Sequence, residues 1–472
     1  MKQNIKLTNI VRYVMIILVV AAGSCKKLQE DPKSIITPDT YYNTIDQVQS
    51  ALVAAQSHLW DQFKGYQEDM FLFNQDDQIT RGNLEIPEDY ASTIWAAHYA
   101  ALLNINQAIA SLNKGLTNTG QEQMDQVMAQ AKFLRAFNYF MLVREFGGVP
   151  LLTDETPDLF GTPVARSSIE EVYAQIIADF TAAIGKLPVS YEDPDRGLPT
   201  RDAAKGLLAK AYLTMATYPL NKTEYYANAA QLAGEIIADG NYSLVPDIKD
   251  LFSAATKYGP EMMWSFNSNN VDLGPDPRLW SDMQGFGTIC AEPAWEQAYP
   301  PSPRKDAFIE TELDGVKYYD LGDYWPGVHK FQYDSPEDIA SNRSIVNMPI
   351  IRFADVLLIF AEADNMANGS PTPAAVDALN KVIDRGNGYV PNTADPLATL
   401  SMSKEEFDTK VIEERNYELC FEMDRWFDLV RKRILEEKTL PDYVINFTED
   451  DYLWPIPSVD VRVNKLEQNP GY

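Results

Sequence analysis

The sequence predicts a mainly α-helical protein in which tetratricopeptide-like helical hairpins support a loop-rich face with a few short β-strands. Three observations lead to this prediction. One helical segment is apolar around most of its circumference and is followed by a second helical pattern. Further helical pairs are rich in small residues, and one long internal stretch lacks helical periodicity. The chain of 472 residues, 45% of them apolar, is long enough for one large domain or two.

The N-terminal residues have the pattern of a targeting segment. A basic start precedes an apolar run, Val14–Ala22, which is too short to span a bilayer as a helix. Small residues then lead to Cys25, as in a bacterial lipobox, where that cysteine is acylated, although Ala22 stands where leucine is usual. A cleaved signal peptide followed by a free thiol is the alternative. Acylation of a soluble body gives a protein anchored to a membrane rather than spanning it.

Helical periodicity recurs through both halves of the chain. Ser168 and Glu171 are placed as a capping box at the start of one helix. The pair Arg201–Thr217 and Glu224–Asp239 alternates small with large apolar residues, as tetratricopeptide-type hairpins do, but without a fixed period. Further helices are predicted at Tyr41–Phe63, Thr93–Leu112, Met124–Phe146, Ser168–Leu187 and Ser403–Arg433.

The stretch from Asn241 to Met348 has a different character. Pro and Gly become frequent, aromatic residues cluster, and helical periodicity is lost. A second segment without periodicity, Phe71–Asp89, is crowded with hydrogen-bonding side chains. Loops of this length inside a compact chain are usually functional, so we expect ligand contacts here. Short β-strands are predicted at Met262–Asn267, Val316–Tyr319 and Val328–Tyr333.

The central element is predicted at Pro349–Gly369. Apolar residues cover most of its circumference, which is typical of a buried helix. Its polar exceptions, Arg352, Asp355 and Glu362, fall on one narrow stripe, and we interpret them as structural charges paired inside the fold rather than as catalytic groups. The following segment, Pro373–Gly386, is predicted to form an antiparallel second helix.

The last predicted helix carries an apolar stripe and, on its polar side, Glu414, Glu418 and Glu422. We interpret this acidic row as a solvated or paired face rather than a catalytic site. The remaining residues are Pro-broken and are expected to wrap over the helices. The expected organisation is a signal peptide at 1–24 and a single domain at 25–472, with a helical core at about 41–240 and 349–435, a loop-rich ligand region at about 241–348 and a wrapping C-terminal segment at 436–472.

The charge balance argues against nucleic acid as a partner. The formal charge is −28, and the only charged residues of the leader are Lys2, Lys6 and Arg12. Their removal leaves 37 basic against 68 acidic residues, a charge of −31. A field of that sign repels phosphate backbones and anionic lipid surfaces but does not restrict a neutral ligand.

Sequence signatures of metal binding and covalent catalysis are absent. The three histidines, His58, His98 and His329, lack zinc-type spacing to one another or to a cysteine. No nucleophile elbow or Gly-rich phosphate loop occurs. The adjacent acids Asp76 and Asp77 do not encode the two opposed carboxylates of a glycosidase. We therefore expect no enzyme activity, no metal and no cofactor.

Two cysteines follow Cys25 in the chain. An exported protein could pair Cys290 with Cys420 in a disulfide. Cys420, however, lies near an apolar helical stripe, where free cysteines are commonly buried.

Five segments together carry a family pattern: Cys25 after a short signal, AKFLRAFNYFMLVREFGGVP, PIIRFADVLLIFAEADN, ERNYELCFEMDRWFDLVR and YLWPIPSVDVRVNKLEQNPGY. With these segments the chain resembles the SusD/RagB family over Cys25–Tyr472. One departure is Ser302, which stands where the family usually carries an Asp before Pro-Arg, so a role of that acid does not carry over to this position.

The resemblance implies an outer-membrane, lipid-anchored protein of Bacteroidetes that faces the cell surface. It implies a mostly helical fold with four tetratricopeptide-like units below a loop-rich face. It also implies an oligosaccharide ligand and a partner, a SusC-like TonB-dependent transporter that takes up the glycan. The matched segments are scaffold residues, so the resemblance does not identify the sugar.

A sugar ring offers apolar faces edged by hydroxyl groups, which flat aromatic side chains and polar side chains can bind. Both kinds of side chain occur in the two loop regions. Trp264 and Trp295 are interpreted instead as core residues. The candidate ligand contacts are Trp280, Tyr299, Tyr324 and Trp325 for stacking, with Asp76, Asp77 and Arg81 for hydrogen bonding.

The function that these observations favour is capture of oligosaccharides at the cell surface and their transfer to a SusC-like transporter. Two alternatives remain open. A surface glycoside hydrolase would use similar aromatic loops, and a tetratricopeptide-like adaptor that binds peptide or protein would use the same helical hairpins.

Overall fold

A computed structural model describes residues 42–63, 88–153, 164–268, 290–322, 325–331, 346–438 and 449–472. These residues belong to one unit, Tyr42–Tyr472. The predicted signal peptide and Cys25 lie outside the described ranges. Among the helices of those ranges, none combines the length and the apolarity needed to cross a membrane.

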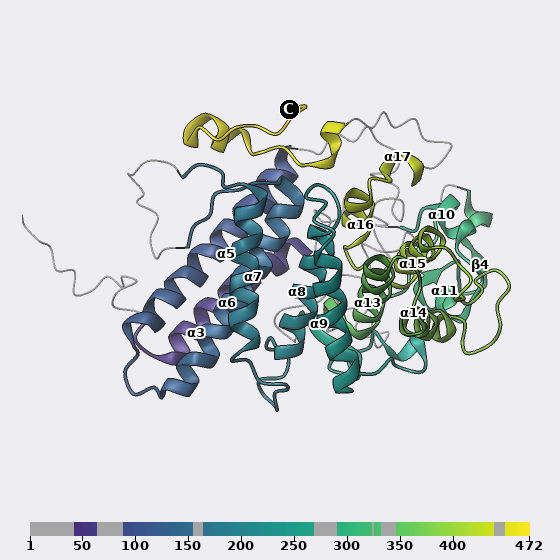
Figure 1. Cartoon of the computed structure of the whole chain (residues 1–472), viewed down its shortest axis with the longest axis horizontal. Coiled ribbons are helices and arrows are strands. Elements are labelled where there is room, and N and C mark those ends of the chain that lie inside the picture. Colours follow the sequence, from purple (N-terminus) through teal and green to yellow (C-terminus); the bar gives the residue numbers. More distant parts are fainter. Residues whose placement is uncertain are drawn as a thin grey trace, which may run out of the picture. The chain divides into compact units, whose positions relative to one another are not determined.

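The helices of the first half pack against their neighbours in sequence. They are α3 (Ile45–Phe63), α5 (Glu88–Lys114), α6 (Gln121–Phe146), α7 (Ile169–Ile184), α8 (Arg201–Met215) and α9 (Tyr225–Asp239). α3 contacts α5, α5 contacts α6, and the order continues through α7 and α8 to α9 (Figure 1). Such neighbour-to-neighbour packing is that of stacked helical hairpins. The predicted mainly helical, tetratricopeptide-like fold is therefore confirmed.

The second half mixes short strands with a further group of helices. The strands are β1 (Met262–Phe266), β2 (Ile309–Glu310), β3 (Glu312–Leu313), β4 (Val316–Lys317), β5 (Gly327–Val328) and β6 (Met348–Arg352). They pair antiparallel as β1 with β6, β2 with β5 and β3 with β4. The helices are α10 (Pro293–Ala298), α11 (Pro303–Phe308), α13 (Phe353–Asn368), α14 (Pro373–Gly386), α15 (Lys404–Glu418), α16 (Arg425–Lys432) and α17 (Leu435–Lys438). Short helical turns occur at Ile248–Asp250, Tyr318–Leu321, Glu449–Tyr452 and Asp460–Asn464.

Local sequence decides where several helices begin and end. Ser168 caps α7 as predicted, because its Oγ accepts from the Glu171 N–H at 3.3 Å and the Glu171 carboxylate accepts from the Ser168 N–H at 2.8 Å. α6 ends where Gly147 adopts a φ of 73°, and the Gly147 N–H donates to the Val143 carbonyl oxygen at 3.1 Å. Residues close in sequence set the start of α7 and the end of α6, so both can be predicted from the sequence.

The central helix is confirmed as α13, which contacts α9, α14 and α15. Its predicted start is wrong, because residues 348–352 form strand β6 and only then does the chain turn into the helix. The paired isoleucines Ile350 and Ile351 favour an extended backbone, and strand β1 supplies the partner that the local sequence does not reveal.

The polar stripe of this element is buried and paired, as predicted. Arg352 is fully enclosed. Asp355 accepts from Arg415 Nη1 at 2.6 Å, and Glu362 accepts from Arg431 Nη2 at 2.7 Å. The partners come from α15 and α16 rather than from the stripe itself. These charges therefore join α13 to its neighbouring helices.

The helix predicted at Ser403–Arg433 is broken into α15 and α16, so that prediction is wrong in its length. Phe421, between the two helices, has a φ of 61°, in the left-handed region that ends helices. Lys330 Nζ donates to the carbonyl oxygens of Glu418 at 3.0 Å and Cys420 at 2.8 Å. Carbonyl groups at a buried helix end need such partners. The break is thus stabilised by a residue far away in sequence.

The last residues of the chain pack across the end of α6. The Trp454 N–H donates to the Glu145 carbonyl oxygen at 2.8 Å, and Asn469 Nδ2 donates to the Phe146 carbonyl oxygen at 3.0 Å. Arg166 also donates to that Phe146 oxygen, at 3.0 Å, and to Asn469 Oδ1 at 2.7 Å. The C-terminal segment therefore satisfies carbonyl groups that have no partner inside the helix.

The carboxyl group of Glu145 is enclosed beneath this segment. Neither of its oxygens has a hydrogen-bond partner among the described residues, and its Oε1 lies 3.9 Å from His98 Nε2. The Asn138 amide nitrogen donates to the Leu134 carbonyl oxygen, so the Asn138 oxygen accepts from His98 Nδ1 at 3.0 Å. Burial raises the pKa of Glu145 to about 8 and lowers the pKa of His98 to about 4. Both groups are therefore neutral at pH 7.

Glu145→Gln is expected to flatten the pH dependence of stability. A glutamate in an unfolded chain has a pKa of about 4.3. Folded Glu145 keeps its proton to about pH 8, so its contribution to stability falls as the pH rises through this interval. Between pH 5.5 and 7.5, the wild type should lose about 1–3 kcal/mol of unfolding free energy relative to the variant.

Urea unfolding at the two pH values measures this difference. Glu122→Gln, an exposed change on the same helix, should keep the wild-type pH dependence. Identical pH dependence in the wild type and in Glu145→Gln would contradict the assignment of a neutral, buried carboxyl group.

Candidate functional site

The structure describes two of the seven predicted ligand contacts, Tyr299 and Trp325. The first is a core residue and the second lies at the surface, partly buried. The predicted contacts Trp280, Tyr324, Asp76, Asp77 and Arg81 lie outside the described residues, as does the predicted lipid attachment site Cys25.

Tyr299 is only 1% exposed. Its ring packs edge-on against Trp295 at 5.4 Å between centroids and in a tilted arrangement against Tyr417 at 4.6 Å. Its hydroxyl donates to the Tyr417 carbonyl oxygen at 3.0 Å. A ring enclosed in this way has no free face for a sugar, so Tyr299 takes no part in the proposal below. Trp264 and Trp295 are also buried, which confirms their interpretation as core residues.

The backbone directly after Trp325 is held in place by β-type hydrogen bonding. The carbonyl oxygen of the next residue, Pro326, accepts from the Ala291 N–H at 2.8 Å. The neighbouring residue Gly327 pairs with Cys290 in an antiparallel bridge. Trp325 is therefore held at the edge of a small β-arrangement while its side chain stays partly exposed.

A hollow of about 230 Å³ lies between α3, the α7–α8 connection and the end of β1; we call it the α3 hollow. Trp60 and Phe266 form its buried aromatic part, with their rings stacked at 5.5 Å and 28°. Its lining is Val53, Gln56, Ser57, Trp60, Pro194, Asp195, Arg196, Leu198, Phe266 and Asn267. Apolar rings edged by amide, hydroxyl and charged groups suit a sugar.

The α3 hollow lies where both predicted ligand loops join the described chain. The contact between Trp60 and Phe266 brings the end of α3 beside the end of β1. The segment that carries Asp76, Asp77 and Arg81 follows α3, and the segment that carries Trp280 follows β1. The ends of α3 and β1, from which these two segments continue, therefore lie close to this hollow.

Asn267 fixes the wall of the hollow. Its Nδ2 donates to the Gly197 carbonyl oxygen at 3.1 Å, and its Oδ1 accepts from Asn347 Nδ2 at 3.0 Å. Gly197 has a φ of 96°, and a Cβ there would lie 2.4 Å from Asn267 Nδ2. Only glycine fits this approach. The sequence at this point thus favours a tight, preformed wall.

The charged side chains at the wall are weakly held. The described ion pair of Arg196 joins its Nε to Asp193 Oδ1 at 3.7 Å, with both side chains well exposed. An exposed pair of this kind contributes little to stability, so the guanidinium can turn toward a ligand. Arg196 and Trp60 were not predicted as site residues from the sequence. Two features could have indicated them: the turn-rich segment around Arg196, and the position of a tryptophan at a helix end before a polar loop.

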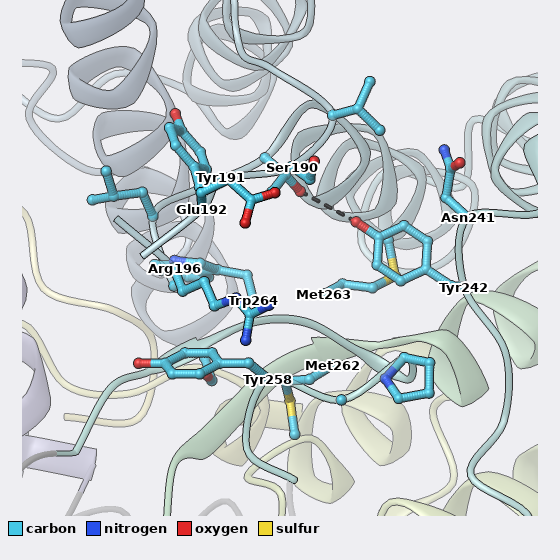
Figure 2. A pocket seen from close by; sticks show the side chains of 17 residues that line it. Ser190, Tyr191, Glu192, Arg196, Asn241, Tyr242, Tyr258, Met262, Met263 and Trp264 are labelled. Atoms are coloured by element: carbon cyan, nitrogen blue, oxygen red, sulfur yellow. Dashed lines mark hydrogen bonds between the residues drawn. The ribbon is translucent and has the colours of Figure 1, made fainter. Parts of the chain in front are cut away.

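A second hollow of about 280 Å³ adjoins the first; we call it the tyrosine hollow. Arg196 and Leu198 line both hollows. Figure 2 shows Tyr191, Tyr242 and Tyr258 around it.

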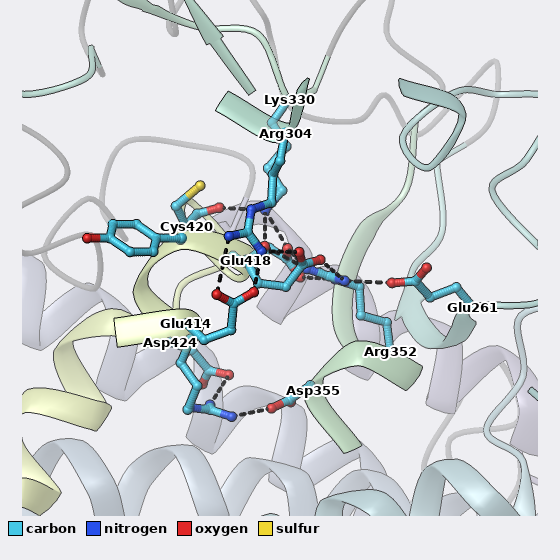
Figure 3. A network of polar contacts seen from close by, with 12 residues as sticks. Glu261, Arg304, Lys330, Arg352, Asp355, Glu414, Glu418, Cys420 and Asp424 are labelled. Carbon is cyan, nitrogen blue, oxygen red and sulfur yellow. Dashed lines mark hydrogen bonds and ion pairs between the residues drawn. The ribbon is translucent and has the colours of Figure 1, made fainter. Parts of the chain in front are cut away.

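A network of buried charges supports the helices behind these hollows. Glu418 accepts from Arg304 at 2.9 Å, Arg352 at 2.7 Å and Arg385 at 2.6 Å (Figure 3). The network balances four basic side chains, Arg304, Lys330, Arg352 and Arg385, against four acidic ones, Glu261, Glu414, Glu418 and Glu422. Because these groups are enclosed and paired, they act as scaffold. The acidic row, interpreted from the sequence as a solvated or paired face, is paired and enclosed.

The described part of the chain forms neither a metal-binding cluster nor a disulfide. Within those ranges, no group of three or more His, Cys, Asp or Glu side chains could hold a metal ion. Cys290 and Cys420 are both buried thiols, and the disulfide considered from the sequence is not formed. Burial raises the pKa of Cys420 to about 11, which keeps it an unreactive thiol.

Two protein-family models each match a separate part of the chain. Residues 29–213 match a family model described as "Starch-binding associating with outer membrane". Residues 317–472 match the model of the SusD family. Residues 214–316, which include most of the loop-rich region, lie between the two matches.

Individual relatives extend over nearly the whole chain. SusD-like protein P2 from Formosa agariphila is 28% identical over 518 aligned residues, which cover 98% of this chain and 99% of that protein. A solved SusD homologue from Bacteroides thetaiotaomicron superposes with a TM-score of 0.76 at 24% identity, covering 92% of this chain and 98% of that one. A laminarin-binding SusD-like protein superposes with a TM-score of 0.72 at 22% identity, covering 91% and 100%. At such identities the superpositions show a shared fold.

Proposed function

The chain belongs to the SusD/RagB family, and from this we propose that it is a cell-surface lipoprotein that binds oligosaccharides and does not cleave them. The observation that carries the proposal is the α3 hollow, where stacked aromatic rings lie beside the attachment points of both predicted ligand loops. The laminarin-binding structural neighbour supports a carbohydrate as the class of ligand.

Anchoring at Cys25 and a SusC-like TonB-dependent transporter complete the proposal. The family description of association with the outer membrane supports this location. Lipid chains on Cys25 would hold the folded domain at that membrane. The domain would then present captured glycan to the transporter.

The proposed contacts combine both loop regions with the α3 hollow. Aromatic faces bind the apolar faces of the sugar, and charged or amide groups bind its hydroxyls. They are Trp280, Tyr324 and Trp325 for stacking, Asp76, Asp77 and Arg81 for hydrogen bonding, and Arg196 at the hollow, where Trp60 forms part of the enclosed base.

Trp280→Ala and Trp325→Ala are each expected to weaken glycan binding by about 1–3 kcal/mol, since each removes a large apolar surface from the ligand. Isothermal titration with the neutral polysaccharide that binds the wild type most tightly, chosen from glucans, mannans, xylans and galactans, measures the loss. Tyr389→Ala is the control, because Tyr389 is a 55% exposed aromatic residue in the turn after α14. Unchanged affinity in both tryptophan variants would remove this surface from the proposal.

The proposal of binding without cleavage has its own test. Prolonged incubation of the domain starting after Cys25 with the same polysaccharides should release no reducing ends. Release that disappears on substitution of one Asp or Glu would favour the glycoside hydrolase instead. Binding of the transporter together with a blank glycan array would favour the protein-binding adaptor.

A further inference from the structure

We propose that the tyrosine hollow is a separate subsite for one neutral pyranose ring of a longer glycan. The inference rests on the proposed function, because it takes the ligand to be a saccharide. It does not use the residues proposed above for stacking, since the hollow is built by the α7–α8 connection, the residues after α9 and strand β1.

The shape of the hollow suits a single ring. Its volume of about 280 Å³ lies near the lower end of ligand pockets, which span roughly 300–1,000 Å³. Met263, Trp264 and Ser265 line it as buried residues of β1, whereas Glu192 and Asn241 line it as exposed ones. The Trp264 indole N–H has no acceptor among the described residues. An apolar base edged by polar groups matches the face and rim of a pyranose.

Tyr191 and Tyr242 are held in place before any ligand arrives. Gln130 Nε2 donates to the Tyr191 hydroxyl at 3.1 Å, and the Tyr242 hydroxyl lies 3.4 Å from Thr200 Oγ1. Burial raises the pKa of Tyr191, Tyr242 and Tyr258, so all three stay protonated near neutral pH. Each phenol can therefore donate to a sugar hydroxyl or accept from one. Rings already oriented lose little entropy on binding, which favours affinity.

The charges at the hollow favour a neutral sugar. Arg196 is opposed by Glu192 within the lining, and exposed Asp193 lies beside it. The chain as a whole carries a charge of −28. A uronate or a sulfated ring would meet both the local acids and this field, so its binding would be disfavoured.

The position of the hollow connects it to the proposed glycan surface. Arg196 and Leu198 form a wall common to both hollows, so a chain bound in the α3 hollow can continue into the tyrosine hollow. Once the first ring is bound, contact with the second subsite becomes intramolecular. Affinity should therefore rise with the length of the oligosaccharide.

Isothermal titration with neutral gluco-, manno-, xylo- and galacto-oligosaccharides of increasing length tests the inference. For the series that binds the wild type, Tyr258→Ala should lower the affinity for the longest member about tenfold and leave the shortest binding member unchanged. Glu192→Ala, a second exposed change at the same hollow, should act in the same direction. Tyr389→Ala should have no effect at any length. Circular dichroism confirms that each variant is folded.

The possible outcomes separate this inference from the proposed function. Wild-type affinities at every length in both Tyr258→Ala and Glu192→Ala, with weaker binding in Trp325→Ala, would overturn the subsite and leave surface glycan binding intact. A wild type that binds no saccharide in the panel would overturn the proposed function and the subsite together. Tighter binding of a polyuronate oligosaccharide that is lost in Tyr258→Ala would overturn the assignment to a neutral ring.

Discussion

Glu418→Gln is expected to lower the free energy of unfolding by about 3–5 kcal/mol. Glu418 accepts hydrogen bonds from Arg304, Arg352 and Arg385 in an enclosed site. Burial alone would raise the pKa of Glu418, but these arginines and Lys330 lower it well below its usual range. A glutamine of the same size removes the negative charge and leaves the arginines with an uncompensated positive charge, which is costly in a buried site.

Urea unfolding at pH 7, followed by circular dichroism, measures this loss. Glu413→Gln is the matched control, because Glu413 is an exposed residue of the same helix α15. It should change the unfolding free energy by less than about 0.5 kcal/mol. A loss below about 1 kcal/mol in Glu418→Gln would mean that the surrounding charges rearrange and that this network does not hold the helices together.

Cys25→Ala is expected to abolish incorporation of labelled palmitate and to release the protein from the membrane fraction. Such a domain is held at a bilayer by burial of its acyl chains, and each buried CH₂ group contributes about 0.8 kcal/mol to membrane binding. Among the described helices, none is able to span a membrane in its place. Metabolic labelling followed by cell fractionation measures both effects.

Cys290→Ala provides the control for this experiment, because Cys290 is a buried cysteine of the folded domain that forms no disulfide. Its palmitate label and membrane association should equal those of the wild type. Label that persists on Cys25→Ala would refute the lipoprotein assignment and favour a cleaved signal peptide.

Features set by neighbouring residues were predictable from the sequence. The capping box of Ser168 and Glu171 needs only residues three apart, and it forms as expected. The nearly all-round apolar character of α13 predicted its burial, because no face of such a helix suits water. The pairing of Asp355 and Glu362 followed from their burial, although the identity of their partners did not.

Features set by distant residues were not predictable in the same way. The break after α15 depends on Lys330, which donates to carbonyl oxygens of Glu418 and Cys420. Residues 348–352 form a strand because β1 lies beside them. In both places tertiary contacts override a local helical pattern.

The roles of the aromatic residues at the candidate site also could not be predicted from the sequence alone. Tyr299 and Trp325 looked equivalent in the sequence, yet Tyr299 packs against Trp295 and Tyr417 in the core while Trp325 is partly exposed. Aromatic side chains serve cores and binding surfaces alike, so composition does not separate the two uses. The α3 hollow also combines three separate elements, which only the fold brings together.

The C-terminal segment that covers α6 has a consequence for how the protein matures. A polypeptide is made from its N-terminus, so Asn469, which follows Phe146 by 323 residues, is synthesised long after α6. Until then, the carbonyl oxygens of Glu145 and Phe146 lack the partners that Trp454 and Asn469 supply. A chain that lacks these two residues would leave the Glu145 carbonyl oxygen without this donor and weaken the end of α6, so a larger fraction of it would be unfolded and open to proteases.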